Sequence, residues 1–316
     1  MPDLTLAFAG TADALGLGEI SIVEKDYYVV ELLRILQPLQ FKSHQLVFAG
    51  STALAKSGID LNRMSEDVDI NLVPSTGFSQ NSLKQRKTIR KHIVSEIYES
   101  IEHSDLFEFD DEFPKKTFNE YRYSCLSIRY PQEFLQAPFL RPFIKLELVE
   151  TEMLQEPQIR SITSLVFDVA QLGSPVENFP SATLASTRVE KLITVMRRTA
   201  ARIRNTERED DESLVRHIYD HFKITEASDV DIGLLIVLAQ ATIAKDAERY
   251  GNQHLQIRED PIVELRSGLD EIGNNPIYEE RYKEFVIPMV YGTTPVSWEE
   301  IYERFHESAT DLLANL

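Results

Sequence analysis

The chain has 316 residues, of which 43% are hydrophobic and 27% are charged; this is an ordinary globular composition, with enough length for two domains. The net charge of −18 argues against a protein that coats nucleic acid, although RNA stays open as a substrate because local patches matter more than the total. A single cysteine, Cys125, excludes an internal disulfide. With no signal-peptide pattern and no apolar run long enough to cross a bilayer, we expect a cytoplasmic protein without membrane association.

The first predicted helix begins at Ser21 and is limited at its far end by Pro38. Ser21 and Glu24 have the spacing of a capping box, and apolar residues then recur at helical intervals. By residue type alone, the neighbouring charges of Glu24, Lys25 and Asp26 predict a solvated helix face.

A strand, a tight turn and a short helix follow at residues 46–58. Residues 46–49 form an apolar run of strand type, and the chain must turn at Gly50. Ser51 can cap a short helix that Gly58 can end. A glycine and a hydroxyl where a helix begins, with backbone N–H groups pointing outward, predict a seat for a phosphate group.

Polar and apolar residues alternate strictly over residues 67–72. In a strand, this alternation places Asp67, Asp69 and Asn71 on one face and the apolar residues on the other. Neighbouring carboxylates repel each other and are tolerated most easily beside a hard cation such as Mg²⁺, or Mn²⁺ in its place. A phosphate seat beside two metal-binding carboxylates predicts nucleotide chemistry.

A second alternating stretch covers residues 143–149, and it places Lys145 and Glu147 on one face. Gly50-Ser51 followed by Asp67-x-Asp69 resembles the pattern of the polymerase-β-like nucleotidyltransferases, whose sites carry a third acid on a neighbouring strand, either to activate the attacking hydroxyl or to complete the metal shell. Glu147 is the best-placed candidate. The alternative is a Lys–Glu pair on an exposed strand face.

Two basic segments interrupt the acidic background. The first lies in a predicted helix at residues 82–101, and the second begins another helix after residue 181. Each is either a solvated helix face or a surface for RNA or triphosphate. Their members are Lys84, Arg86, Lys87, Arg90 and Lys91 in the first, and Arg188, Lys191, Arg197, Arg198, Arg202, Arg204 and Arg208 in the second.

Residues 48–54 (FAGSTAL) and 63–69 (RMSEDVD) resemble the AbiEii/AbiGii-type nucleotidyltransferase toxins, which belong to the polymerase-β-like nucleotidyltransferase superfamily. Those toxins carry a strand, a Gly-Gly/Ser-Thr-Ala-Leu turn, a basic residue and Ser-x-Asp-x-Asp. Ala49 stands where the family often has a first glycine. The stretch Glu24–Tyr27, the Lys-x-Glu strand at residues 145–147 and the Glu-Lys-Leu helix at residues 190–192 are similar to further family elements.

The last family motif, Arg-Asp-x-x-Asp-Leu, is similar to residues 216–221. Arg216 and Asp220 match, whereas His217 replaces the first aspartate and leaves the role of that carboxylate in doubt. His217 and His221 are spaced as a metal pair could be, but no further ligand pattern surrounds them.

The resemblance implies an α/β nucleotidyltransferase lobe with a mixed sheet over residues 1–180 and a mainly α-helical lobe over residues 181–316 that closes the active-site cleft. It implies transfer of a nucleoside monophosphate from an NTP to an acceptor hydroxyl, with release of pyrophosphate. The implied catalytic residues are Asp67, Asp69, Glu147, Lys191 and Asp220, with metal on the first two. The implied nucleotide-binding residues are Gly50, Ser51, Arg63, Ser65, Lys145, Lys191 and Arg198.

The biological role implied by the resemblance is the toxin of a bacterial toxin–antitoxin or phage-defence pair. Its acceptor would be the 3′ end of tRNA, and its partners would include a cognate antitoxin protein. No residue specifies that acceptor. Two alternatives stay open: the same chemistry on a protein or a small molecule, and a catalytically idle member that acts as a binding partner or regulator.

Overall fold

The computed structural model describes residues 4–205, 207, 210–292 and 294–316, and it divides into two compact units. The sheet unit comprises Met1–Gly58 and Met64–Ala182. The helical unit comprises Ile59–Arg63 and Thr183–Leu316. The predicted boundary after residue 180 lies close to this division, but the short segment Ile59–Arg63 groups with the helices.

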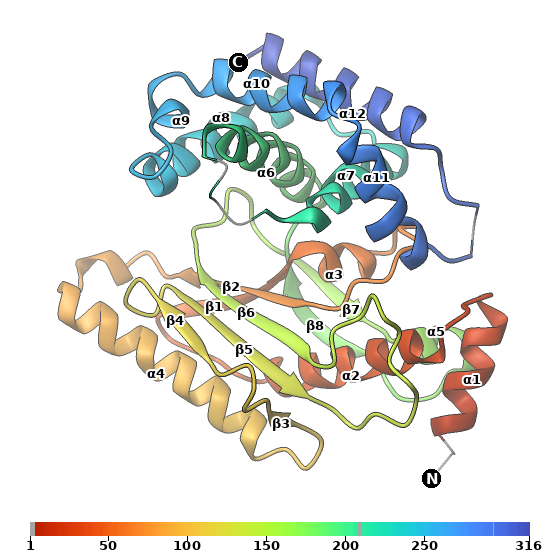
Figure 1. The fold of residues 1–316 in the computed structure, drawn as a ribbon. Helices are drawn as coiled ribbons and strands as arrows, with labels where there is room; N and C mark the ends of the chain where they lie inside the picture. The colour runs from red at the N-terminus through yellow and green to blue at the C-terminus, as the bar shows by residue number, and fades with distance from the viewer. Residues whose placement is uncertain (1–3, 206, 208–209, 293) are drawn as a thin grey trace. The chain divides into compact units, whose positions relative to one another are not determined.

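The sheet unit is built on one mixed sheet with the strand order β3-β5-β6-β2-β1-β8-β7, and β4 pairs with β5 (Figure 1). β2 and β6 are parallel, as are β1 and β8, while the other pairs are antiparallel. The mixed sheet and the helical C-terminal region confirm the predicted fold class. The strands are β1 (His44–Ala49), β2 (Val68–Pro74), β3 (Glu108–Phe109), β4 (Lys116–Phe118), β5 (Tyr123–Arg129), β6 (Ile144–Glu150), β7 (Gln158–Ile162) and β8 (Val176–Ser181).

One face of this sheet is covered by α2 and α4 (Figure 1). Val68, Ile70 and Leu72 of β2 are fully buried in the resulting core. Because side chains alternate along a strand, the polar residues of β2 and β6 lie on the opposite face. The helical segments of the unit are α1 (Leu4–Ala14), α2 (Ile20–Leu36), α3 (Gly50–Ala55), η1 (Phe78–Gln80), α4 (Leu83–Glu102) and α5 (Leu165–Ala170).

The start of α2 differs from the prediction. The helix begins at Ile20 after Glu19, without a side-chain cap. Ser21 Oγ instead accepts from the Ala137 backbone N–H at 3.2 Å, so the predicted capping box is wrong. Glu24, Lys25 and Asp26 are buried rather than solvated. Loops that are distant in sequence supply the partners of these charges, and residue type alone cannot reveal such partners.

Two connections are more regular than their composition suggests. The acidic residues 102–119 contain β3 and β4, and Asp110 is buried with the guanidinium of Arg129 2.9 Å away. The stretch 166–180, which includes Gly173, Pro175 and Pro180, contains most of α5 before β8.

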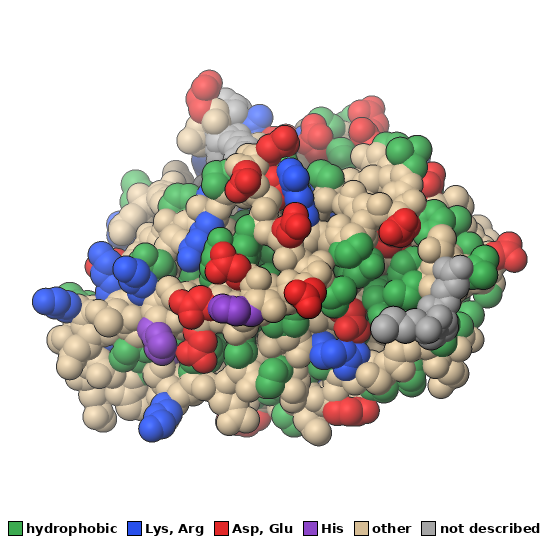
Figure 2. All heavy atoms as spheres, turned by 90° about the horizontal axis from the view of Figure 1, so that it is seen from below, with side chains coloured by type: hydrophobic (Ala, Val, Ile, Leu, Met, Phe, Trp, Pro, Cys, Tyr) green, Lys and Arg blue, Asp and Glu red, His purple; other side chains and the backbone are tan. Residues whose placement is uncertain are grey.

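The basic segment of α4 is only partly a surface feature. The helix has a capping box between Ser82 and Gln85, and Arg90 is buried, with its Nε 2.5 Å and its Nη2 2.9 Å from the Glu150 carboxylate. Arg90 therefore does not belong to an RNA-facing patch, whereas Lys84, Lys87 and Lys91 are exposed. On the face that Figure 2 shows, basic side chains are spread out and separated by acidic and neutral ones.

We expect Glu150 to make stability depend on pH. Burial opposes its ionisation, but hydrogen bonds from His44 and Arg90 lower the pKa of Glu150 to about 2. Because the folded-state pKa is depressed, the stabilisation is present above the ordinary value of 4.5 and is lost as the pH falls from there towards 2. Glu150→Gln should therefore cost roughly 1–3 kcal/mol at pH 7, and much of this difference from wild type should vanish at pH 3.

Urea denaturation at both pH values, followed by circular dichroism, measures this difference. Glu156→Gln, at an exposed glutamate, is the control and should change stability little at either pH. An equal cost of Glu150→Gln at pH 7 and pH 3 would contradict the assignment.

The helical unit is organised around α6, which packs against α7, α8 and α10 (Figure 1). α10 approaches closely because residue 268 is glycine: a Cβ there would lie 2.0 Å from the carbonyl oxygen of Met196. The helical segments of the unit are α6 (Leu184–Arg204), η2 (Glu212–Val215), α7 (Arg216–Ala227), α8 (Ile232–Tyr250), α9 (Leu255–Glu259), α10 (Pro261–Asn274), α11 (Ile277–Phe285), η3 (Ile287–Met289) and α12 (Trp298–Ala314).

The segment Ile59–Arg63 is held within the helical unit by backbone hydrogen bonds. The Tyr219 hydroxyl donates to the Leu61 carbonyl oxygen at 2.8 Å, and the Tyr291 N–H donates to the Asn62 carbonyl oxygen at 2.9 Å. This segment carries Arg63, which lies two residues before Ser65, the first residue of the Ser-x-Asp-x-Asp motif. Residues 59–63 have neither helical nor strand periodicity, so the sequence does not predict that they belong to the helical unit.

The basic segment of α6 is largely matched by acidic partners. Arg197 is buried 2.7 Å from Asp246, and its guanidinium also lies 4.0 Å from the centre of the Tyr250 ring. Arg208 lies outside the described residues. The other pairs are Arg198–Asp211, Arg202–Asp210 and Arg204–Glu264. Within the described part of the chain, no helix is long and apolar enough to span a membrane.

Candidate active site

Asp69 and Glu147 are direct partners on the adjacent parallel strands β2 and β6. Asp67 lies two residues before Asp69, immediately ahead of β2. The alternation of β2 and β6, which buries one set of side chains against α2 and α4, thus leaves carboxylates side by side on the other face. The expectation that Glu147 stands on a strand next to the Asp67–Asp69 stretch agrees with this register.

The turn at Gly50 brings backbone against the Asp69 carboxylate. Ala49 is the register partner of Asp69 on the antiparallel strand β1, and Gly50 follows with a φ of 75°. A Cβ at this position would lie 1.9 Å from Asp69 Oδ2, so only glycine fits. Gly50 is itself the first residue of α3, and the cap position falls on Ala49 rather than on Ser51 as expected. Ser51 is half-buried in the first turn of α3.

Thr52 connects this turn to the second half of the motif. Its buried hydroxyl lies 2.8 Å from Ser65 Oγ and contacts the carbonyl oxygen of Asp67. A single threonine therefore fixes the distance between α3 and the residues that lead into β2. Ser65 remains half-buried beside the carboxylates.

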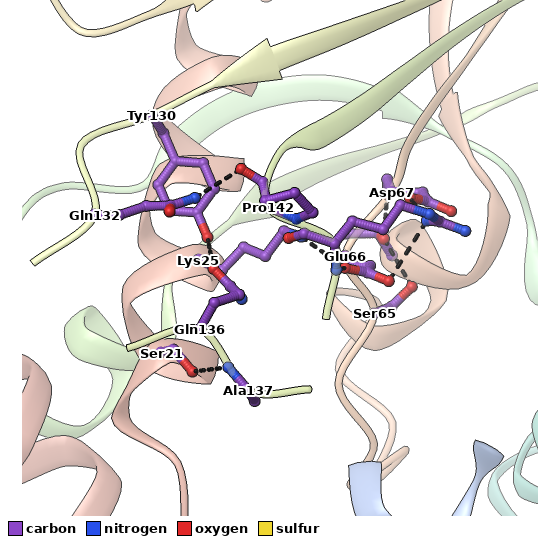
Figure 3. Close-up of polar contacts among 12 residues, drawn as sticks. Ser21, Lys25, Ser65, Glu66, Asp67, Tyr130, Gln132, Gln136, Ala137 and Pro142 are labelled. Atoms are coloured by element: carbon purple, nitrogen blue, oxygen red, sulfur yellow. Dashed lines mark hydrogen bonds and ion pairs between the residues drawn. The ribbon is translucent and has the colours of Figure 1, made fainter. Parts of the chain in front are cut away.

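A network of buried charged side chains fixes the position of Asp67. Lys25 of α2 is fully buried, and its Nζ lies 2.6 Å from Glu66 Oε2 and 2.7 Å from the Arg141 carbonyl oxygen. The backbone N–H of Arg141 donates a hydrogen bond to Glu66 Oε2 at 2.8 Å, and the Arg141 guanidinium contacts the Asp67 carboxylate. In Figure 3, Lys25 and Glu66 point towards one another, close to Ser65 and Asp67. The network therefore positions Asp67 through two consecutive residues of the motif.

The ionisation of Asp67 is balanced between two opposing influences. Burial raises the pKa of the Asp67 carboxyl, and the guanidinium of Arg141 opposes this shift. Burial likewise lowers the pKa of Lys25, while Glu66 opposes that shift. Because burial disfavours the ionised form of Asp67, a further cation beside the carboxylate would stabilise that form.

Glu147 is held as a carboxylate by its neighbours. Burial alone would raise its pKa, but the ammonium group of Lys145, which contacts it, brings the pKa of Glu147 below its ordinary value. The Tyr123 hydroxyl donates to Glu147 Oε1 at 2.7 Å. Burial and this acceptor raise the pKa of Tyr123, so its hydroxyl stays protonated.

In the helical unit, Asp220 is the centre of a second buried cluster. It is fully buried, accepts from Arg63 Nε at 3.1 Å and Nη2 at 2.8 Å, and lies 3.1 Å from Lys191 Nζ. Burial opposes its charge, but Arg63 and Lys191 hold the pKa of Asp220 far below its usual range. Arg63 and Lys191 are also buried, so the alternative in which the basic segment of α6 is a solvated helix face does not hold for Lys191.

His217 lies on α7 one turn before Asp220. Burial and the nearby Lys191 lower the pKa of His217 well below its usual range, so the imidazole is neutral. It therefore cannot replace the charge of the aspartate found in the motif that this stretch resembles. Arg198 on α6 is partly exposed and lies 2.9 Å from Asp211.

Comparison with known proteins decides the family. Residues 32–304, most of the chain, match the family described as nucleotidyl transferase AbiEii toxin, type IV TA system. The chain belongs to the AbiEii family. It is accordingly a nucleotidyltransferase toxin of a type IV toxin–antitoxin system, and the family implies an NTP as substrate and an antitoxin as partner.

Two solved structures resemble the chain. MenT4, a nucleotidyltransferase toxin from Mycobacterium tuberculosis, is 18% identical, with a TM-score of 0.63 over 98% of this chain and 90% of that one. This likeness supports the fold. A c-di-GMP synthase, the STING-associated CdnE from Capnocytophaga granulosa, is 13% identical, with a TM-score of 0.24 over 95% of this chain and 83% of that one. A search of curated proteins found no match.

The donor atoms of this AbiEii-family chain suit a hard divalent cation. Asp67 and Asp69 offer carboxylate oxygens, which Mg²⁺ and Mn²⁺ prefer. Among the described residues, no three His, Cys, Asp or Glu side chains converge on one point. Mg²⁺ is usually bound in proteins by one or two carboxylates and completes its shell with phosphate oxygens and water.

The sequence patterns did not single out four residues of this network. Glu66 occupies the variable position of Ser-x-Asp, and Lys25 stood out only through the resemblance. Arg141 lies in an irregular stretch with no motif, and Tyr123 sits on a strand whose partner was unknown. Tyr123 could have been found from strand pairing, since Cys125 opposes Glu147 and Tyr123 lies two residues away on the same face. Nothing local marks Arg141.

Proposed function

We propose that this AbiEii-family toxin transfers a nucleoside monophosphate from an NTP to the 3′ end of tRNA in a metal-dependent reaction, as one half of a toxin–antitoxin and phage-defence pair. The observation that carries the proposal is the row of carboxylates on one sheet face: Asp69 beside Glu147, with Asp67 two residues earlier and the Gly50 backbone against Asp69. Polar groups of this kind suit the binding of a cation and a polyphosphate together.

Asp67 and Asp69 are the proposed metal ligands, and Arg141 keeps Asp67 oriented. The cation, when bound, neutralises triphosphate charge and stabilises the leaving pyrophosphate. Gly50, Ser51 and Ser65 are proposed to hold phosphate oxygens through backbone N–H and hydroxyl groups. The hydrogen bond between Thr52 and Ser65 holds the start of α3 next to the residues that lead into β2.

Glu147 is the proposed third acid. In the reaction the acceptor oxygen bonds to the α-phosphorus, the bond from the α-phosphorus to the bridging oxygen of the β-phosphate breaks to release pyrophosphate, and the acceptor proton passes to solvent water. The low pKa of Glu147, held by Lys145, favours a carboxylate that orients the acceptor hydroxyl or binds the cation over one that stores the proton. Lys145 is proposed to bind the nucleotide phosphates. Its ammonium group contacts Glu147 and therefore lies on the strand face that carries the carboxylates.

In the helical unit, Lys191 is the proposed phosphate-neutralising cation and Asp220 the residue that positions it. Arg198 is proposed to contact the nucleotide, because its side chain is partly exposed. Arg63 is buried and shares Asp220 with Lys191, so we now propose a structural role for Arg63 in place of phosphate binding.

The acceptor can be tested directly. The purified toxin should label total tRNA when each of the four α-labelled NTPs is supplied with Mg²⁺, and periodate treatment of the tRNA, which destroys the 3′-terminal diol, should abolish labelling. Labelling of protein but not RNA would replace tRNA with the protein alternative, and labelling of an added antibiotic would support the small-molecule alternative.

The exposed lysines of α4 offer a further test of the tRNA proposal. Reversing Lys84, Lys87 and Lys91 to glutamate should weaken tRNA labelling about tenfold or more at low salt and much less at high salt, because each lysine neutralises a phosphate. NTP binding should be unchanged. Reversing Lys223, Lys245 and Lys283 is the matched control for total charge. If both triple variants lose activity equally, α4 provides no specific contact.

A further inference from the structure

A pocket of about 240 Å³ lies within the helical unit, between α6, α7, α8 and α12. Its apolar wall is formed by four buried side chains and by the partly exposed Ile232, and its volume is below the roughly 300–1,000 Å³ of pockets that take drug-sized ligands. A compact ligand with an apolar body therefore fits it best. The apolar wall consists of Val189, Leu192, Ile232, Leu235 and Leu312.

Opposite charges line the same pocket without pairing. Arg188 of α6 and Asp311 of α12 both face it, and neither forms an ion pair with any residue that the structure describes. Burial lowers the pKa of the Arg188 guanidinium; the carboxylate of Asp229 opposes this shift but forms no ion pair with Arg188 among the described residues. Arg304 and Glu307, also on α12, form their own pair at 3.2 Å.

His221 of α7 adds a hydrogen-bonding atom to the wall. The residue is 1% exposed, and its Nδ1 has no hydrogen-bond partner among the described residues. Burial lowers the pKa of His221 to about 3, so the ring is neutral. A buried polar atom without a partner costs free energy, and a ligand that supplied one would recover it.

We infer that this pocket binds a free α-amino acid with an apolar side chain, of the size of leucine or phenylalanine. The carboxylate pairs with Arg188, the ammonium group pairs with Asp311, and the side chain lies against Leu192, Leu235 and the other apolar residues. A zwitterion supplies both missing charges at once, whereas a simple acid or amine supplies only one.

The inference is independent of the proposed function, although the pocket borders the same helices. Arg188 lies one turn before Lys191 on α6, and His221 directly follows Asp220 on α7. A bound amino acid would therefore contact the two helices that hold the buried Lys191–Asp220 pair.

Isothermal titration calorimetry on the full chain tests the inference. L-Leucine or L-phenylalanine should bind, whereas L-leucinamide, which lacks the carboxylate, and 4-methylpentanoate, which lacks the ammonium group, should bind at least about tenfold more weakly. No binding of either amino acid at millimolar concentration would overturn the inference. Binding of 4-methylpentanoate as tight as that of leucine would overturn the amino-acid class.

Variants locate the binding. Arg188→Gln should weaken leucine binding about tenfold or more, and Leu235→Phe should block it by filling the pocket. Arg258→Gln, on exposed α9, is the matched control and should bind like wild type. Thermal unfolding checks that each variant is folded; if Leu235→Phe is not, Arg188→Gln decides alone. Unchanged binding to folded Arg188→Gln would overturn the assignment.

Discussion

Asp69→Asn is expected to abolish nucleotidyl transfer, with a loss on the order of 10³-fold or more, while the protein stays folded. The asparagine keeps the size of the side chain but removes one of the neighbouring charges that a divalent cation needs. Asp69 stands beside Glu147 and hydrogen-bonds to it, and the asparagine amide can keep that hydrogen bond, so stability should change little. Asp67→Asn should lose activity similarly, with a small stability cost because Arg141 loses its partner.

Transfer of α-labelled NTP measures the activity, and thermal unfolding with and without Mg²⁺ measures folding and metal binding. Mg²⁺ together with an NTP should stabilise wild type but not Asp69→Asn. Asp111→Asn, at an exposed position of the same unit, is the control. Full transfer activity in either carboxylate variant would refute the metal assignment.

Gly50→Ala probes the same carboxylate without changing any charge. Its Cβ would fall 1.9 Å from Asp69 Oδ2, and the positive φ adds strain, so Asp69 must move. A large loss of transfer is expected. Gly58→Ala, also at positive φ but with open space around the Cβ, separates backbone strain from displacement of the carboxylate and should stay active.

Asp220→Asn is expected to destabilise the helical unit by about 3–5 kcal/mol, because it leaves Arg63 and Lys191 buried beside each other without a counter-charge. Lys191→Met should cost less, since Asp220 keeps the two hydrogen bonds from Arg63. The double variant should recover part of the loss, because only one cation then stays unpaired.

The single tryptophan, Trp298, lies in α12, so its fluorescence during urea denaturation reports on this unit. Asp211→Asn, which removes the half-exposed partner of Arg198, is the control and should cost under about 1 kcal/mol. If Asp220→Asn unfolds no earlier than this control, the buried cluster does not stabilise the unit. A Lys191→Met protein that keeps wild-type triphosphate affinity would remove Lys191 from the nucleotide site.

The local parts of the site could be predicted from residue patterns along the chain. Strict alternation over residues 67–72 and 143–149 fixed which side chains share a face, because the period of a strand is two. Gly50 could be identified as a required turn, and the spacing of the motifs was sufficient to identify the family. The helix expected after residue 181 likewise corresponds to α6 (Leu184–Arg204), whose helical form depends on local spacing.

The burial and pairing of charged side chains depend on residues distant in sequence, and they are seen only in the tertiary structure. Lys25, Arg90 and Lys191 looked like solvated charges, and each is buried against a carboxylate remote in sequence: Glu66, Glu150 and Asp220. The charge of a lysine or arginine is the same in either setting, so composition carries no sign of the partner. Only the fold, which brings the chain back to these positions, supplies the counter-charge that makes burial possible.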